Sequence, residues 1–281
     1  MPFGDFSRIN TNVQAMGSLR SLQNTNNMLG MRQLRLSTGS RINRAEDDTA
    51  GYGIAKKLQA KVRGQAQALA NIGDAKSMLT VAEGGLNTIM DILQNMKEKT
   101  IQAANDTMGT NERTAIKSEL DALAAEIDDI VADAEFNGNS LFSTGAQTSF
   151  TFQVNAESGD TFVATIATIS ASVLNVSAGV LVVVSAASAG ATLTNVDAAI
   201  QSVADMVASV GDSQKRLTYK EQNLAVSMNN YEAARSRIAD ADFAREQMEI
   251  VKLQILQQTG TASLAQANAA PQAVLSLIGG G

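Results

Sequence analysis

Histidine, cysteine and tryptophan are absent from this chain of 281 residues, and proline occurs only as Pro2 and Pro271. Without histidine or cysteine there is no imidazole general base, no thiol nucleophile, no disulfide and no zinc site of the usual ligand types. A metal could bind only through oxygen, and we expect neither a metal nor a cofactor. The shortage of proline leaves nearly the whole chain free to form helices.

The net charge of −6 is unevenly distributed along the chain. Lysine and arginine are absent from residues 118–214, which hold 12 of the 28 acidic residues. The rest of the chain carries all 22 basic residues and 16 acidic ones, a charge of +6. Aromatic residues make up only 4%. Nucleic acid binding needs basic clusters together with stacking aromatics, so we expect no nucleic acid partner.

The N-terminal residues do not form a secretory signal. Residues 1–31 contain Asn, Gln and Ser throughout, whereas such a signal has a basic start followed by an apolar run. The most apolar stretch, residues 180–184, is far shorter than the ~20 residues of a membrane-spanning helix. We therefore expect no cleavable signal and no membrane insertion.

A seven-residue apolar repeat predicts a long coiled-coil helix in the C-terminal third. Its members are Val196, Val203, Val210, Leu217, Leu224, Tyr231 and Ile238. Thr194 stands three residues before Asp197, which resembles a capping box and predicts that the helix begins near residue 194.

The N-terminal half carries two further apolar stripes at helical spacing, separated by a turn at residues 106–111. We interpret both stripes as packing surfaces, because apolar residues at this spacing pack far more often than they bind a ligand. The first contains Leu58, Val62, Leu69, Ile72, Leu79, Leu86, Met90 and Leu93, and the second contains Ile116, Leu120, Leu123, Ile127 and Ile130.

One segment alternates with the period of a strand. Phe150, Phe152 and Val154 share a face, and Phe162, Ala164 and Ile166 do so after a turn, which predicts a β-hairpin. We expect the sheet to be confined to it. Residues 143–194 contain 16 Ser or Thr among 52 and no Lys or Arg, a composition typical of an exposed insertion.

Both ends of the chain are nearly free of charge yet show helical apolar stripes. Residues 253–281 contain no charged residue, and residues 1–31 contain three. The two ends could pair within one subunit, or pair and then pack against neighbours in a polymer; the lack of charge on all faces favours the polymer. The stripes are Ile9, Val13, Met16, Leu19, Leu22, Leu29 and Leu36, and Met248, Val251, Ile255, Ala262, Ala265 and Ala269.

Three groups of motifs resemble those of bacterial flagellin, the subunit of the flagellar filament. The first is LSTGSRIN at residues 36–43 with AEDDTAGYGIA at residues 45–55, and the second is Phe136-Asn137-Gly138 with the hairpin after it. The third comprises SRIADADFA at 236–244, QIL at 254–256, GTA at 260–262, LAQAN at 264–268 and PQAVLSL at 271–277. The resemblance covers roughly residues 5–142 and 194–278, far more than a short motif.

The resemblance implies a mainly α fold with long antiparallel coiled-coil helices formed by both termini and a small β-hairpin region in the middle. Residues 1–42 and 245–281 would form the inner core of a filament and be disordered in the monomer. Residues 43–142 and 194–244 would form an outer helical bundle, and residues 143–193 a short variable surface insertion. The implied subunit-packing residues are Ile9, Val13, Met16, Leu19, Leu22, Leu29, Leu36, Val251, Ile255, Leu264, Val274 and Leu277.

The resemblance also implies partners and a location. The chain would polymerise with copies of itself outside the cell, after export through the flagellar type III apparatus, and meet filament cap and hook-filament junction proteins. A cytoplasmic export chaperone would bind the C-terminal segment through Ile255, Leu256, Leu264, Val274, Leu275, Leu277 and Ile278.

A Toll-like receptor that senses flagellins contacts the outer helices of relatives. Gln94 and Glu119 match the receptor-active pattern, whereas Asn95 replaces an arginine and Lys99 replaces a leucine. Because such anchors often dominate an interface, we expect weak receptor activation.

Two alternatives share the terminal helices. Hook-filament junction proteins usually have proline after the paired aspartates, whereas Thr49 follows Asp47 and Asp48 here. A filament that displays a metallopeptidase would need an inserted domain with histidine ligands, which this chain lacks. We therefore expect a filament subunit rather than an enzyme.

Overall fold

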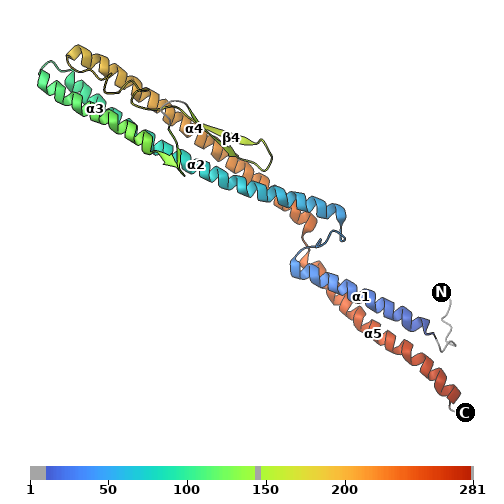
Figure 1. Cartoon of the computed structure of the whole chain (residues 1–281). Coiled ribbons are helices and arrows are strands. Elements are labelled where there is room, and N and C mark those ends of the chain that lie inside the picture. Colours follow the sequence, from blue (N-terminus) through green and yellow to red (C-terminus); the bar gives the residue numbers. More distant parts are fainter. Residues whose placement is uncertain (1–10, 143–146, 280–281) are drawn as a thin grey trace. The chain divides into compact units, whose positions relative to one another are not determined.

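The chain folds into five helices and two small hairpins in a computed structural model that describes residues 11–142 and 147–279, with side chains described as far as residue 269 (Figure 1). The helices are α1 (Val13–Thr38), α2 (Thr49–Ala103), α3 (Thr110–Asp133), α4 (Ala186–Ala239) and α5 (Phe243–Gly279). The strands are β1 (Glu135–Phe136), β2 (Asn139–Ser140), β3 (Thr148–Gln153) and β4 (Thr161–Ile166). The prediction of a mainly α fold is confirmed.

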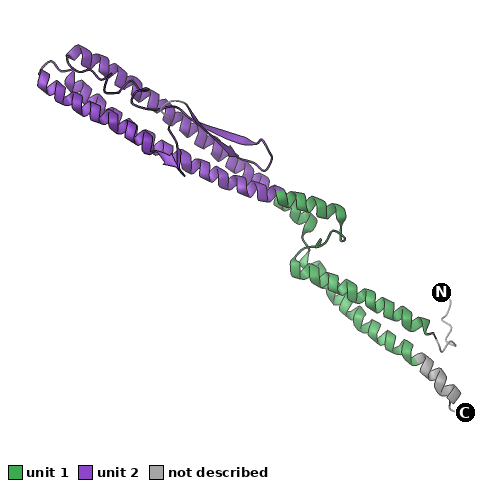
Figure 2. Ribbon diagram, in the orientation of Figure 1, with its two compact units in different colours: residues 1–60, 231–281 green, residues 61–230 purple. Residues whose placement is uncertain are grey.

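The chain divides into two compact units (Figure 2). Unit 1 comprises residues 1–60 and 231–281, and unit 2 comprises residues 61–230. The long helices α2 and α4 each begin or end in unit 1 and continue into unit 2.

In unit 1, α1 and α5 pair as antiparallel helices. Asn12 Nδ2 donates to Ala267 O at 2.8 Å, Gln257 Nε2 donates to Asn26 Oδ1 at 2.8 Å, and Arg32 Nη1 bonds Glu246 at 2.9 Å. Partners later in α1 are thus earlier in α5, which confirms the predicted antiparallel pairing of the two ends.

In unit 2, α2, α3 and α4 enclose one apolar core. Five members of the seven-residue repeat of α4, from Val196 to Leu224, are buried, and Tyr231 and Ile238 are half-buried. Ile72, Leu86 and Leu93 of α2 are fully enclosed, as are Leu120 and Ile127 of α3. The predicted stripes are therefore packing surfaces.

The predicted start of α4 is wrong by two turns. The helix begins at Ala186, where Ser185 and Ser188 cap it reciprocally: Ser188 N donates to Ser185 Oγ at 3.2 Å and Ser185 N to Ser188 Oγ at 2.9 Å. Thr194 lies inside the helix and donates to Gly190 O, and Asp197 pairs with Lys97 rather than capping. Serine at both cap positions gave a weaker sequence signal than Thr194 with an acidic residue.

The predicted hairpin is present, with Phe150 opposite Ala164 and Phe152 opposite Phe162. Phe162 is buried, and the Arg216 guanidinium lies 4.9 Å from its ring centroid. The expectation that sheet is confined to this hairpin is wrong, since β1 and β2 form a second one. Its loop is Asn137-Gly138 with φ of 52° and 75°, the two positive values that a type I′ turn requires.

The segment between β4 and α4 is part of the core of unit 2. Residues expected in a surface insertion alternate between solvent and interior, and Ile169, Leu174, Val176, Leu181 and Val183 are buried. Thr192 of α4 holds the segment by donating to Val182 O at 2.9 Å and accepting from Val182 N at 3.1 Å. The hydroxyl of Thr192 therefore anchors this extended segment to α4.

No described helix combines the length and apolarity needed to cross a membrane. Within the same residues, Asp and Glu do not gather in groups of three that could hold a metal ion.

Candidate assembly surface

The paired helices α1 and α5 of unit 1 touch along an inner stripe. It contains Leu22, Leu29 and Leu36 of α1 and Ile250, Leu253, Gly260, Leu264 and Ala267 of α5. Leu29, Ile250 and Leu253 are its buried centre, with Leu36 packed against them. A Cβ added at Gly260 would lie 3.3 Å from Leu22 Cδ1, so the glycine lets the helices approach closely. This stripe closes the pair within one chain.

A second group of apolar side chains on the same helices is exposed and has no partner among the described residues. We call it the outer stripe; it contains Val13, Met16, Leu19, Met28, Met31 and Leu34 of α1 and Phe243, Met248, Val251, Ile255 and Leu256 of α5. Met16 is 60% exposed and Ile255 59% exposed. Arg20 is the single charged residue of α1 before Arg32, and α5 carries none after Lys252. Apolar surface of this extent marks an interaction site.

The residues predicted to pack subunits divide between the two stripes. Leu22, Leu29, Leu36 and Leu264 belong to the inner stripe, and Val13, Met16, Leu19, Val251 and Ile255 belong to the outer stripe. Ile9 and the side chains of Val274 and Leu277 lie outside the described residues. The structure therefore places four of the predicted residues in the contact between α1 and α5 and five on exposed surface.

The C-terminal stripe of the sequence lies on a different face of α5 from the one that contacts α1. Met248, Val251, Ile255, Ala262, Ala265 and Ala269 are all exposed. The residues that contact α1 are offset by two and follow 250, 253, 257, 260, 264 and 267, also with spacings of three and four. Gln257 and Gly260 interrupt this second pattern and weaken its signal in the sequence. Met28, Met31, Leu34 and Phe243 of the outer stripe were not predicted, because they lie off the apolar stripes identified in the sequence.

Of the residues predicted to bind an export chaperone, Ile255 and Leu256 are exposed and Leu264 is half-buried against α1. The side chains of Val274, Leu275, Leu277 and Ile278 lie outside the described residues. Part of this set is therefore accessible on the outer stripe.

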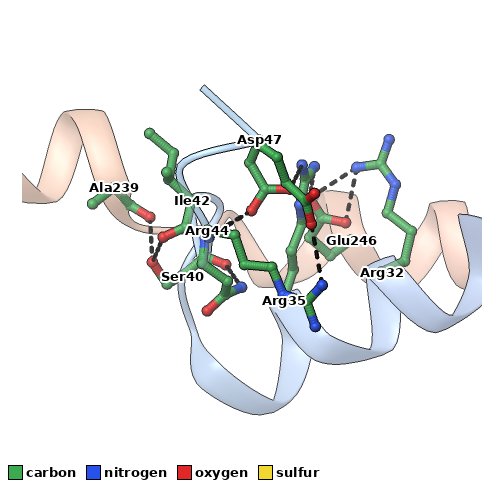
Figure 3. A network of polar contacts seen from close by, with 10 residues as sticks. Arg32, Arg35, Ser40, Ile42, Arg44, Asp47, Ala239 and Glu246 are labelled. Carbon is green, nitrogen blue, oxygen red and sulfur yellow. Dashed lines mark hydrogen bonds and ion pairs between the residues drawn. The ribbon is translucent and has the colours of Figure 1, made fainter. Parts of the chain in front are cut away.

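A polar network holds the loop after α1 against the start of α5 (Figure 3). Arg32 Nη1 donates to both carboxylate oxygens of Glu246 at 2.9 Å, and Arg35 lies 3.9 Å from both Glu246 and Asp47. Glu246 is buried, and its ion pairs with these arginines offset the cost of removing the carboxylate from water. Ser40 Oγ donates to Ala239 O at 2.9 Å, which ties the loop to the end of α4.

Asp47 organises the loop itself. The backbone N–H groups of Asn43 and Arg44 each donate to Asp47 Oδ2 at 2.9 Å. These hydrogen bonds, first that of Arg44 and then that of Asn43, lower the pKa of the Asp47 carboxyl, and the positive charges of Arg35 and Arg44 add to the effect. The motif at residues 36–55 therefore forms a structural joint between α1 and α2. Gly51 is required there, because a Cβ would collide with the Asp48 carboxylate, whose Oδ1 accepts from Gly51 N at 2.9 Å.

The four positions predicted to face an immune receptor lie in unit 2. Gln94 and Asn95 are exposed on α2, and Lys99 Nζ forms an ion pair with Glu119 Oε1 at 2.7 Å. Lys99 therefore pairs with Glu119, one of the two positions that match the receptor-active pattern.

Both terminal regions match one family. Residues 9–147 match the family described as bacterial flagellin N-terminal helical region, and residues 193–278 match bacterial flagellin C-terminal helical region. These segments include all five helices apart from the first turns of α4 and the last residue of α5.

Similar proteins span nearly the same length. The chain is 37% identical over 283 residues to the flagellar filament 33 kDa core protein of Treponema phagedenis, covering 96% of this chain and 99% of that protein. It is 34% identical over 270 residues to a flagellin of Halalkalibacterium halodurans, again covering 96% and 99%. A crystal structure of Bacillus cereus flagellin is 32% identical, with a TM-score of 0.48, over 55% of this chain and 88% of that one. The chain therefore belongs to the bacterial flagellin family.

Proposed function

We propose that the chain is a structural subunit that assembles into the bacterial flagellar filament, the helical propeller of swimming cells. The observation that carries this function is the outer stripe, a set of exposed apolar side chains on two helices with long, nearly uncharged parts: residues 13–31 carry only Arg20, and residues 253–279 carry no charge. Burial of such a row in a polymer removes it from water, and its low charge avoids a desolvation penalty.

The proposed mechanism couples folding to assembly. The inner stripe has a small buried centre, so the pair α1 and α5 gains only modest stability from packing in a single chain. Neighbouring subunits that cover the outer stripe add the missing apolar burial. The terminal helices would therefore become fully ordered only in the filament.

The proposal extends to the partners that such a subunit meets during export and assembly. Export through the type III apparatus, an export chaperone that covers Ile255, Leu256 and Leu264, and contact with cap and hook-filament junction proteins fit a subunit that must stay unassembled in the cell. Exposure of Ile255 and Leu256 supports a chaperone contact at the outer stripe. No observation favours the alternative that the chain is itself a junction protein.

Truncation tests the proposed function. The full chain should form filaments visible by electron microscopy, and a variant that lacks residues 253–281 should form none. Circular dichroism should show that the truncated variant retains the cooperative melting of unit 2, because the residues of that core lie within 68–224. Filaments formed by the truncated variant would contradict the proposal.

Weak activation of the immune receptor is a separate proposal. Lys99→Leu with Asn95→Arg restores the receptor-active pattern and frees Glu119 from its ion pair. Purified monomer of this double variant should signal at least ~10-fold more strongly than the natural chain in a reporter cell, since anchor residues dominate interfaces. Equal signalling by the two proteins would refute the assignment of these positions.

A further inference from the structure

One face of α4 presents an exposed aromatic ring between unpaired lysines. Tyr219 is 70% exposed, and Lys215 and Lys220 beside it are exposed and form no ion pair within the described chain. Open hollows of about 440 and 430 Å³ adjoin the ring; the turn of the β3–β4 hairpin lines the first, and Lys76 and Lys215 line the second. We call this surface the Tyr219 face.

An exposed tyrosine ring such as that of Tyr219 is typical of an interface. Tyrosine is enriched among the residues that dominate protein interfaces, and it buries a large area at low entropic cost. The hollows on both sides give a partner concave surface to fill. Asp160 also lines the first hollow, but Lys215, Lys220 and Lys76 outnumber it, so this surface favours a partner that is acidic at this point.

The second half of α3 carries the matching charge. In its first half two of the three acids are neutralised, since Glu119 pairs with Lys99 and Asp121 with Lys117. Glu126, Asp129 and Asp133 follow on exposed positions, and none of them forms an ion pair with any described residue. Because residues 118–214 contain no Lys or Arg, the adjoining part of α4 supplies no counter-charge.

We propose that the Tyr219 face of one copy docks on the second half of α3 of a neighbouring copy in the filament. The two surfaces are opposite in charge and both lie in unit 2. Among the described residues, neither the exposed lysines of the Tyr219 face nor the exposed acids in the second half of α3 form ion pairs. This inference rests on the proposed function, because it names a second contact between subunits besides the outer stripe. The proposed contact between the helices of unit 2 is electrostatic and should weaken as salt is added, whereas the contact through the outer stripe is apolar.

Introduced cysteines test the contact directly, because the natural chain contains none. One chain carries Lys220→Cys and a second carries Asp133→Cys, and the two are mixed, assembled and oxidised. A disulfide needs Cα atoms within ~7 Å, so a disulfide-linked heterodimer on a non-reducing gel reports contact between copies. Ser118→Cys replaces Asp133→Cys as the control: it is exposed on the same helix, about 22 Å away at 1.5 Å per residue. The proposal predicts heterodimer with Asp133→Cys and little with Ser118→Cys.

Charge reversal provides an independent measurement. Lys215→Glu with Lys220→Glu should raise the critical concentration for assembly about tenfold, since like charges then face each other. Asp129→Lys with Asp133→Lys should do the same, and the chain with all four substitutions should assemble nearly as well as the natural one. Lys57→Glu with Arg63→Glu, at exposed positions of α2, controls for the change in net charge.

The outcomes separate the two proposals. Filaments that give no heterodimer, or charge reversals that the fourfold variant does not rescue, overturn the docking inference and leave the filament function standing. Failure of the natural chain to form filaments overturns both.

Discussion

At the scale of single residues, Gly64 fixes where the β3–β4 hairpin lies on α2. A Cβ at this position would lie 2.7 Å from Ala156 Cβ in the hairpin turn, closer than side chains tolerate. Lys61 Nζ, 3.0 Å from Glu157 Oε1, and Asn71 Nδ2, 3.1 Å from Gln153 O, hold the turn in place. The hairpin therefore cannot move away from α2 to accommodate a Cβ at Gly64 without breaking these polar contacts.

Gly64→Ala should destabilise unit 2 although alanine favours helices. Overpacking costs about 1–3 kcal/mol, which offsets the gain of about 1 kcal/mol in helix propensity. Gly73→Ala is the matched control in the same helix, because nothing lies within 4 Å of its added Cβ, and it should stabilise. Denaturant unfolding of both variants gives the comparison; stabilisation by both would show that the hairpin turn is not seated on Gly64.

Asp47 makes the joint sensitive to acid. Its pKa is lowered in the folded chain, so its contribution to stability is present above the unfolded pKa of about 3.9 and is lost as pH falls through the folded pKa. Asp47→Asn should lower the melting temperature at pH 7 by about 2–4 °C, through weaker bonds to two backbone N–H groups.

The pH dependence separates this effect from a packing defect. The difference between Asp47→Asn and the natural chain should shrink as pH falls below 4 and disappear below the lowered pKa of Asp47, where both side chains are neutral. Glu46→Gln is the control, since Glu46 is exposed and pairs only with the exposed Arg44. A difference that persists unchanged at pH 2.5 would exclude the charge of Asp47 as the cause.

At the scale of elements, α1 separates two tasks between adjacent residues. Leu29 is 9% exposed on the inner stripe and Met28 is 53% exposed on the outer stripe. Leu29→Ala removes apolar burial from a small core, at a cost of about 2–5 kcal/mol, and should reduce the helicity of the unassembled chain. Met28→Ala should leave that helicity unchanged, because exposed substitutions alter stability by less than ~0.5 kcal/mol.

Assembly should rank the two variants differently from helicity. Met28→Ala should raise the critical concentration for filament formation while the circular dichroism spectrum of the monomer stays the same. Loss of monomer helicity in Met28→Ala would place its side chain in the α1–α5 contact instead of on the outer stripe.

The same helices show how far sequence reasoning reaches. The repeat of α4 predicted both the helix and its buried face, because each member of the seven-residue repeat from Val196 to Leu224 is apolar. In α5 two stripes of equal spacing compete, and only the position of α1 decides which is inner. The cap of α4 was not predicted because serine, as at Ser185 and Ser188, is also common in loops. The burial of Leu181 and Val183 was not predicted because Thr192 holds the residue between them through hydrogen bonds that form only in the folded chain.

At the scale of the whole molecule, the two units should differ in stability when the chain is alone. The core of unit 2 extends from Ala68 to Leu224 across three helices, a hairpin and an extended segment. The cluster joining α1 and α5 has three buried residues, with Leu36 packed against them. Local stability follows buried apolar contact, so the terminal helices should open far more often than the helices of unit 2.

Hydrogen exchange measured by mass spectrometry tests this difference in monomer and filament. Amides of residues 13–35 and 247–267 should exchange quickly in the monomer and at least ~10-fold more slowly in the filament, because neighbours then cover the outer stripe. Amides of residues 72–93 and 196–217 should be protected in both states and serve as the internal control. Equal protection of the terminal helices in the two states would mean that they complete their folding before assembly, and that the outer stripe contributes contact area without driving order.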